Sequence, residues 1–230
     1  LTMICALFYW FYGMTGFEAV THAMTTIATG GFSTSDQSLG HFNSAAIDWT
    51  AVIFMIVGSL PFVLYLQAVR GHPGELVRDA QVKTFLVITI VLVTLVTCGY
   101  WATSGGSLLH ALRMSALNAV SIMTGTGYTT ANFDAWGAFA VPLFFIAMFI
   151  GGCAGSTTCG IKIFRFQVLY ATAITQMRQL LQPHGVFIAY YNRRPIPEEV
   201  AVSVMSFVFL YVLCFAVLAT VLGALGLEFL

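Results

Sequence analysis

Two short stretches of the sequence combine glycine and threonine in a pattern that suits ion binding. The first is ATGGFST, centred on Thr29, Gly30, Gly31 and Phe32, and the second is TGTGYTT. Glycine leaves its carbonyl oxygen uncrowded and adopts backbone angles that other residues avoid. Neither stretch holds a carboxylate, imidazole or thiolate, which excludes most catalysis and tight binding of divalent ions. Backbone and hydroxyl oxygens suit a weakly hydrated monovalent cation, which exchanges its water shell for carbonyls.

The two stretches occupy matching positions in an internal repeat. HAMTTIATGGFSTSD, which starts at His22, aligns with NAVSIMTGTGYTTAN, which starts at Asn118, so that Gly31 falls on Gly127. The candidate residues of the second copy are Gly125, Thr126, Gly127 and Tyr128. The order of threonine, glycine and an aromatic residue is a degenerate form of the potassium-filter sequence TVGYG. Because the pattern occurs twice, we predict that both turns line one ion path.

A short helix-compatible segment precedes each turn. Residues 16–28 and 107–123 are moderately apolar but contain polar residues such as Glu18 and Arg113. Because they are too short or too polar to cross a bilayer in contact with lipid, each must dip in against other protein and return. A half-helix that enters from outside directs its partly negative C-terminal end at the turn, which favours a cation there. An anion site would need the opposite helix end.

The composition predicts an all-α integral membrane protein. The chain is 59% hydrophobic and only 8% charged, with a mean hydropathy of +0.89, whereas about a quarter of the residues in a soluble domain are charged. A spanning helix needs about 20 mainly apolar residues. The candidate spans are 45–69, 82–101, the run that begins at 139, 200–222 and, as the end of a further helix, 1–12.

The basic residues indicate how the chain is oriented in the membrane. Eight of the nine lysines and arginines fall in two segments, 70–83 and 162–194. By the positive-inside bias these segments face the cytoplasm, whereas 13–44 and 102–137 face outward. The chain opens with neither a methionine nor a basic segment, from which we expect a fragment of a longer protein.

A third stretch, GGCAGSTTCG at 151–160, interrupts an apolar run. One straight helix over 138–174 would be about 55 Å long, well beyond a bilayer core of roughly 30 Å, so the helix must break. The glycines weaken a helix, and the hydroxyl side chains satisfy freed backbone groups and offer oxygens to a passing ion. The alternative, tight helix packing through Gly151 and Gly155, leaves the Ser-Thr-Thr run unexplained. The candidate loop residues are Gly151, Gly152, Gly155, Ser156, Thr157, Thr158, Cys159 and Gly160.

The stretches TTIATGGFST, FIGGCAGST and GIKIFR, with the spacing between them, resemble the Trk/Ktr/HKT superfamily of potassium transporters, and specifically its bacterial TrkH-type membrane subunits. Members have four repeats of helix, pore helix, filter turn and helix around one pore. The chain resembles repeats two and three. The resemblance implies that residues 1–69 hold the end of a first helix, a pore helix, a filter turn and a second helix, followed by a cytoplasmic linker at 70–81. A complete repeat with a broken second helix then covers 82–181. Another cytoplasmic linker (182–199) leads to the first helix of an incomplete repeat (200–230).

The resemblance implies potassium uptake across the bacterial cytoplasmic (inner) membrane rather than an enzyme activity. K⁺ is the transported ion, and no organic cofactor is expected. The expected ligands are the backbone carbonyls of Thr29, Gly30, Gly31, Thr126 and Gly127. Residues 151–160 would form an intramembrane gate loop, although Thr158 and Cys159 stand where members commonly carry further glycines. Lys162 resembles a basic residue of the family and either tunes ion access from the cytoplasm or follows the positive-inside bias.

The resemblance also implies partners. We expect a homodimer, a cytoplasmic nucleotide-binding regulatory subunit similar to TrkA, and membrane lipid, but no nucleic acid. The basic segments 70–83 and 176–194 are the docking surface for the regulatory subunit or for anionic lipid. Two other functions stay open: a secondary transporter of a small organic solute with discontinuous helices, and a non-conducting membrane scaffold.

Overall fold

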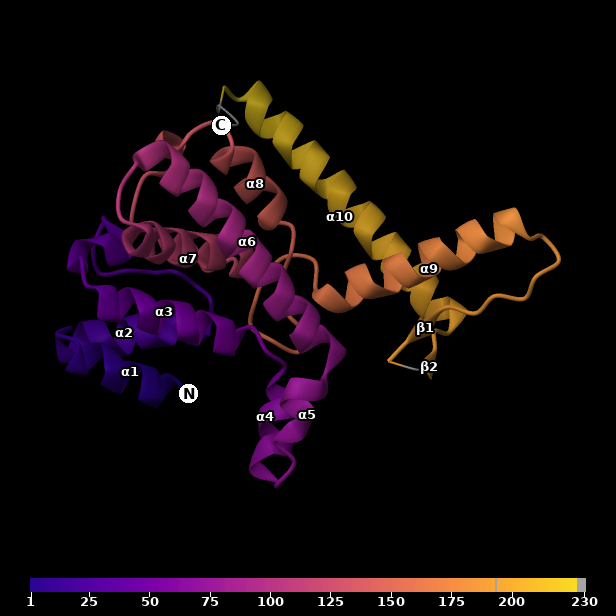
Figure 1. Ribbon diagram of the computed structural model, residues 1–230, viewed down its shortest axis with the longest axis horizontal. Coiled ribbons are helices and arrows are strands. Elements are labelled where there is room, and N and C mark those ends of the chain that lie inside the picture. The colour runs from indigo at the N-terminus through magenta and orange to yellow at the C-terminus, as the bar shows by residue number, and fades with distance from the viewer. Residues whose placement is uncertain (193, 227–230) are drawn as a thin grey trace. The chain divides into compact units, whose positions relative to one another are not determined.

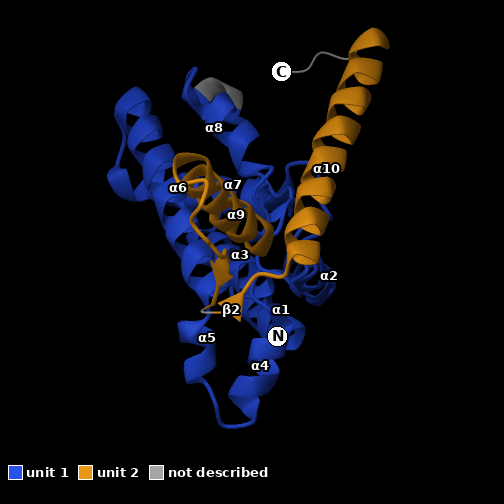
Figure 2. Cartoon of the chain, turned by 90° about the vertical axis from the view of Figure 1, so that its right-hand side faces the viewer, with its two compact units in different colours: residues 1–163 blue, residues 164–230 orange. Residues whose placement is uncertain are grey.

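The computed structural model describes residues 1–192 and 194–226, without the side chains of residues 134 and 135. Arg193, in the expected docking segment, and the end of the expected last helix lie outside the described residues. The chain divides into two compact units, residues 1–163 and 164–230 (Figure 2). This boundary falls inside the segment 82–181, which the sequence assigns to a single repeat.

The first unit begins with the elements of the first predicted repeat. They are α1 (Thr2–Phe11), α2 (Gly16–Ile27), the 3-10 helix η1 (Ser38–Phe42), α3 (Ala45–Gly58) and α4 (Phe62–Val69). The half-helix α2 starts with a capping box, in which the Glu18 N–H donates to Thr15 Oγ1 (3.4 Å) and the Thr15 N–H donates to the Glu18 carboxylate (2.9 Å). This exchange satisfies two N–H groups at the helix start and fixes where α2 begins.

The apolar segment 45–69 is not one straight helix. α3 and α4 are bent by 90° at residues 59–61. Pro61 has no N–H to continue the helix. The carbonyl of Ser59, freed at the bend, accepts a hydrogen bond from the Cys153 N–H (3.0 Å). The bend, which the apolar run alone did not reveal, therefore joins the first repeat to the stretch 151–160.

The second predicted repeat follows. Its elements in the first unit are α5 (Gly74–Arg78), α6 (Ala80–Ser104), α7 (Leu108–Thr124), the 3-10 helix η2 (Phe133–Trp136) and α8 (Ala140–Ala147). The apolar run is interrupted after α8, and the next helix begins only at Ile163. Ile150 and Ile161 form an isolated parallel bridge. This bridge draws the two ends of the intervening loop together.

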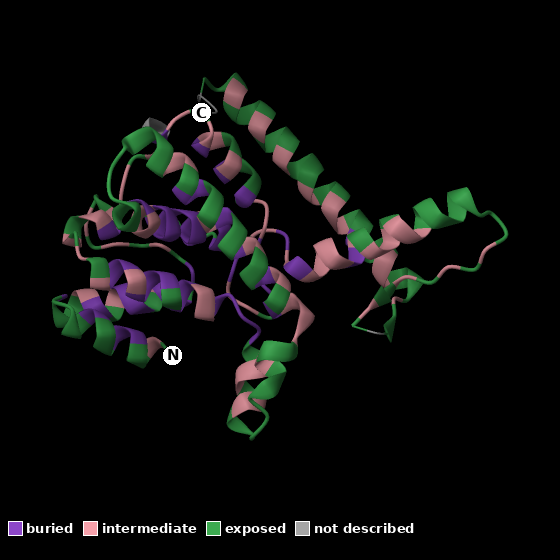
Figure 3. Ribbon diagram, viewed as in Figure 1, coloured by how far each residue is buried: buried purple, intermediate pink, exposed green. Residues whose placement is uncertain are grey.

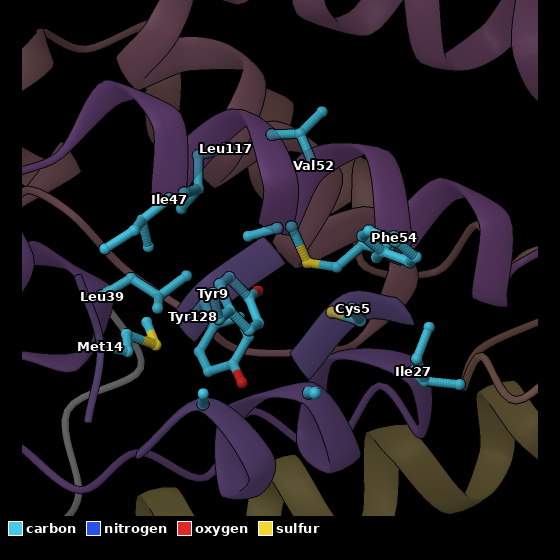
Figure 4. Packing of buried hydrophobic residues seen from close by; sticks show 14 of the residues in the cluster. Cys5, Tyr9, Met14, Ile27, Leu39, Ile47, Val52, Phe54, Leu117 and Tyr128 are labelled. Carbon is cyan, nitrogen blue, oxygen red and sulfur yellow. The ribbon is translucent and has the colours of Figure 1, made fainter. Parts of the chain in front are cut away.

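The core of the first unit forms where the two repeats meet. α3 packs against both half-helices, α2 and α7, and α6 packs along the other side of α7 (Figure 1). The half-helix α7 is buried over most of its C-terminal half, including the polar residues Asn118 and Ser121 (Figure 3). Tyr9 and Tyr128, from different repeats, lie in the same apolar cluster (Figure 4). The half-helix α7 is therefore largely enclosed by protein, as a non-spanning helix in a membrane requires, whereas α2 is buried on one face and exposes Phe17, Val20 and Met24 on the other.

The second unit holds α9 (Ile163–Leu181, from its second residue onward), the two-stranded antiparallel sheet of β1 (Tyr190–Tyr191) and β2 (Arg194–Pro195), and α10 (Glu198–Ala224). The Arg165 guanidinium of α9 lies 3.7 Å from the centre of the Phe207 ring of α10, a cation–π contact. α6 and α10, with 25 and 27 residues, are long and apolar enough to cross a membrane, and the bent pair α3–α4 is a third candidate.

Candidate functional site

The two glycine turns lie against each other. Each follows the C-terminal end of a half-helix, α2 or α7. A Cβ added at Gly31 would stand 2.8 Å from the carbonyl carbon of Thr126, closer still to its oxygen, and 3.4 Å from the carbonyl carbon of Gly127. Only glycine leaves room for this approach. The fold therefore brings the two predicted turns into backbone contact.

The backbone repeats the same conformation in both turns. Thr29 and Gly31 have φ values of 49° and 66°, and the matching residues Gly125 and Gly127 have 72° and 86°. A left-handed backbone at a threonine costs about 1–2 kcal/mol relative to glycine. The Thr29 hydroxyl donates to the carbonyl of Thr157 (3.1 Å), a contact that helps to hold this conformation. The repeat seen in the sequence is thus also a repeat in backbone geometry.

Tyr128 joins the second turn to the half-helix of the first repeat. Its side chain is 1% exposed. Its hydroxyl lies 2.5 Å from Thr25 Oγ1 and donates to the carbonyl of His22 (3.1 Å). Phe32, the matching residue of the first repeat, is 77% exposed among the described residues. The two repeats therefore use their aromatic residues differently.

The same half-helix also supports its own turn. Thr25 Oγ1 donates to the carbonyl of Phe32 (2.9 Å). The buried imidazole of His22 joins the carbonyl of Glu18 (Nδ1, 2.8 Å) to the hydroxyl of Ser33 (Nε2, 3.1 Å). These contacts make His22 a structural residue, because both ring nitrogens already have partners. Glu18 lies at the exposed start of α2, and hydrogen bonds from Thr15 lower the pKa of its carboxyl group.

A buried ion pair connects the repeats near the start of α3. Arg113 Nε of α7 donates to Asp48 Oδ2 of α3 at 2.6 Å. The Asp48 side chain is only 2% exposed and that of Arg113 is 18% exposed. Beyond the turns, the Gly40 N–H donates to the Thr129 carbonyl (3.2 Å). The turns are therefore fixed by two sets of contacts between the repeats: those of Tyr128 with α2, and those made by the segments that follow the turns.

The loop 151–160 is hydrogen-bonded to the ends of both half-helices. Thr157 Oγ1 donates to the carbonyls of Ile27 (2.9 Å) and Gly58 (3.1 Å). The Cys159 N–H donates to the carbonyl of Thr124 (3.4 Å). Ile27 and Thr124 end α2 and α7, where carbonyls have no partner within the helix. The loop thus supplies donors to the partly negative ends of both half-helices.

The loop itself is compact, and its first two glycines are needed for space. A Cβ at Gly152 would stand 2.7 Å from Thr158 Oγ1 and 2.8 Å from the Ser59 carbonyl oxygen. The Gly152 N–H donates to Thr158 Oγ1 (2.9 Å) and the Gly151 N–H to the Ile161 carbonyl (2.9 Å). Thr158, which stands where family members commonly carry a glycine, therefore takes part in the structure of the loop, because its hydroxyl accepts a hydrogen bond from the Gly152 N–H.

The chemistry of the site rests on oxygen atoms without charge. Within the described ranges, no group of three or more histidine, cysteine, aspartate or glutamate side chains could hold a metal ion. The turns offer backbone carbonyls and threonine hydroxyls, at the C-terminal ends of two helices. Such a donor set suits a monovalent cation and suits neither a divalent ion nor an anion.

These features define a class of membrane protein, one built from tandem repeats in which pore helices hold glycine turns side by side. The family model for TrkH, a cation transport protein, matches residues 1–229, and the chain belongs to this family. The resemblance found in the sequence and the all-α membrane fold are thereby confirmed. The family is one of transporters, not enzymes.

Individual relatives agree with this assignment. The chain is 40% identical to the Trk system potassium uptake protein TrkI of Halomonas elongata, covering 99% of this chain and 46% of that protein. It is 33% identical to the Trk system potassium uptake protein TrkH of Escherichia coli K12, covering 99% and 48%. The crystal structure of the potassium transporter TrkH from Vibrio parahaemolyticus matches with a TM-score of 0.94 and 33% identity, over 99% of this chain and 50% of that one. The chain thus spans about half the length of these relatives.

Proposed function

We propose that this chain forms half of a potassium-conducting pore in the bacterial inner membrane. K⁺ loses water at the turns and is held by the carbonyl oxygens of Thr29, Gly30, Gly31, Thr126 and Gly127. The observation that carries this proposal is the close backbone approach of Gly31 to Thr126, because two turns that line one ion path must lie side by side. The names of the relatives, potassium uptake and transport proteins, support K⁺ as the ion.

The arrangement of the half-helices favours a cation over other ligands. α2 and α7 both end at a turn, so both direct a partly negative C-terminal end toward it. A secondary transporter for an anionic solute would need helix N-termini at this place. Two turns from one chain make up half of a four-part filter, and the remaining turns would come from the other half of the protein.

The loop 151–160 is the proposed gate. Its hydrogen bonds from Thr157 and Cys159 to the ends of both half-helices support this role, because an ion that leaves the turns past those helix ends would meet the loop. The gate opens when these hydrogen bonds break and the loop moves aside. The full protein acts as a homodimer with a cytoplasmic nucleotide-binding subunit, for which the basic segments 70–83 and 176–194 provide a docking surface.

Flux measurements on the native full-length protein in liposomes test this function. The expected result is uptake of ⁸⁶Rb⁺, a K⁺ substitute, with much slower uptake of Na⁺. Flux that depends on an organic solute would favour a secondary transporter. Absence of any flux, with protein shown to be inserted and folded, would favour a scaffold and overturn the proposal.

A further inference from the structure

Lys162 lies two residues after the end of the loop 151–160, and its ammonium group points back onto the loop. Its Nζ donates to Thr158 Oγ1 (3.0 Å), to the carbonyl of Ser156 (3.5 Å) and to the carbonyl of Thr158. All three acceptors belong to the candidate gate. The ammonium group is therefore surrounded by loop oxygens and does not simply extend into solvent.

These oxygens are of the kind proposed to bind K⁺ in the turns. They are two backbone carbonyls and one threonine hydroxyl, all of them uncharged oxygens of the loop. Thr158 is 4% exposed, and its Oγ1 is fixed by the Gly152 N–H (2.9 Å) and lies 2.9 Å from the Ser156 hydroxyl. An ammonium group and a dehydrated K⁺ ion carry the same charge and use the same oxygen ligands. The loop thus contains a preformed site for a monovalent cation.

We propose that the Lys162 ammonium is a tethered substitute for the transported cation. It occupies an oxygen site within the gate loop and holds the loop closed, and the same oxygens bind a passing monovalent cation once the side chain withdraws. This inference rests on the proposed function and specifies how the same pore is regulated. Lys162 is then a positioning residue of the gate.

The backbone around Lys162 makes the contact specific. The Ile161 N–H donates to the Phe149 carbonyl (2.9 Å), and the Gly151 N–H donates to the Ile161 carbonyl (2.9 Å). These bonds clamp the two ends of the loop together immediately before Lys162. The opposite side of the loop is bound to the ends of α2 and α3 through Thr157. Withdrawal of the ammonium group therefore loosens the loop on the side away from the turns while the turns keep their own support.

The test uses the native full-length protein in liposomes, with ⁸⁶Rb⁺ and ²²Na⁺ uptake measured for Lys162→Gln, Lys162→Arg and Lys83→Gln. Lys83 is an exposed lysine of the proposed docking segment 70–83. In liposomes of zwitterionic lipid without a regulatory subunit this segment has no partner to dock, so the Lys83 substitution removes the same charge without touching the loop. Loss of a charge-assisted hydrogen bond shifts an equilibrium by roughly tenfold or more. We expect Lys162→Gln to raise Rb⁺ uptake about tenfold with an unchanged ratio of Rb⁺ to Na⁺. Lys83→Gln stays at the wild-type rate, and Lys162→Arg, which keeps the charge, restores most of the closure.

Each other outcome is decisive. A Lys162→Gln protein that conducts like wild type, or less, refutes the tether while the pore itself stands. A changed ratio of Rb⁺ to Na⁺ in this variant also refutes it, since the residue would then shape the filter. If Lys162→Gln fails to fold, the Lys162→Arg variant decides. Uptake of Rb⁺ well above the wild-type rate in this variant would refute the tether, because a retained charge would then not close the gate. A silent wild type would refute the pore, and the tether with it.

Discussion

Substitution of Gly31 by alanine is the most direct perturbation of the proposed filter. Gly31 has a φ of 66°, and an added Cβ would lie 2.8 Å from the carbonyl carbon of Thr126. Carbon atoms in favourable contact stand about 3.5–4.0 Å apart, so the two backbones must separate by about 0.7 Å or more. The left-handed backbone adds about 1–2 kcal/mol of strain at a residue with a side chain.

The structure indicates how large the effect should be. The displaced group is the Thr126 carbonyl, one of the proposed K⁺ ligands, and its shift takes an oxygen out of contact with the ion. The net value of one such polar contact is about 1 kcal/mol, and more when a charge takes part, so the preference for K⁺ should fall about tenfold. Overall stability should fall by a comparable amount through the φ strain.

The assay is the ratio of ⁸⁶Rb⁺ to ²²Na⁺ uptake by the full-length protein in liposomes. Gly30→Ala is the steric control, because its Cβ would lie 3.5 Å from the Phe32 ring, an ordinary contact, and Gly30 has no positive φ. We expect a clearly smaller loss of selectivity in this control. Equal ratios for Gly31→Ala and wild type, in folded protein, would refute the idea that the contact between the turns shapes the filter.

Three further substitutions test the supports of the site. Tyr128→Phe should lower the free energy of unfolding by about 1–3 kcal/mol, because it leaves buried oxygen partners on α2 without their donor; thermal unfolding in detergent measures this. Arg113→Met should lower the free energy of unfolding by about 3–5 kcal/mol, because it leaves the buried carboxylate of Asp48 without its ion-pair partner. The double variant with Asp48→Asn should recover most of that loss in the same assay. Glu18→Gln should remove one contribution to stability that depends on pH. Hydrogen bonds from Thr15 lower the pKa of the Glu18 carboxyl in the folded protein. The ionised carboxylate therefore stabilises the fold above the pKa that Glu18 has in the unfolded chain, and this stabilisation is lost as the pH falls through the folded pKa. If the free energy of unfolding falls equally in wild type and in Glu18→Gln as the pH is lowered, this assignment is contradicted.

The sequence predicted the parts of the site that follow from local chemistry. The aligned glycines Gly31 and Gly127 were found because only glycine suits a crowded, left-handed backbone, and such positions repeat when the repeat unit does. The interruption near 151–160 followed from helix length against bilayer thickness. Family membership followed from the same stretches and is confirmed.

The rest depends on contacts between segments far apart in the chain. The 90° bend after α3 was hidden because 45–69 is mostly apolar on both sides of Pro61. The bend is held by hydrogen bonds from the second repeat, among them the one from the Cys153 N–H to the Ser59 carbonyl. Tyr128 and Phe32 occupy matching positions, yet only Tyr128 is buried, since only it has a hydroxyl that Thr25 and His22 can bind. No local pattern distinguishes these outcomes.

Anomalous scattering of Rb⁺ or Tl⁺ in crystals of the full-length protein shows directly whether the turns hold an ion. We expect a peak within ligand distance of the carbonyl oxygens of Gly31 and Thr126, where the two turns meet. A bound ion found only elsewhere, or turns that hold no ion in protein that transports Rb⁺, would contradict this expectation.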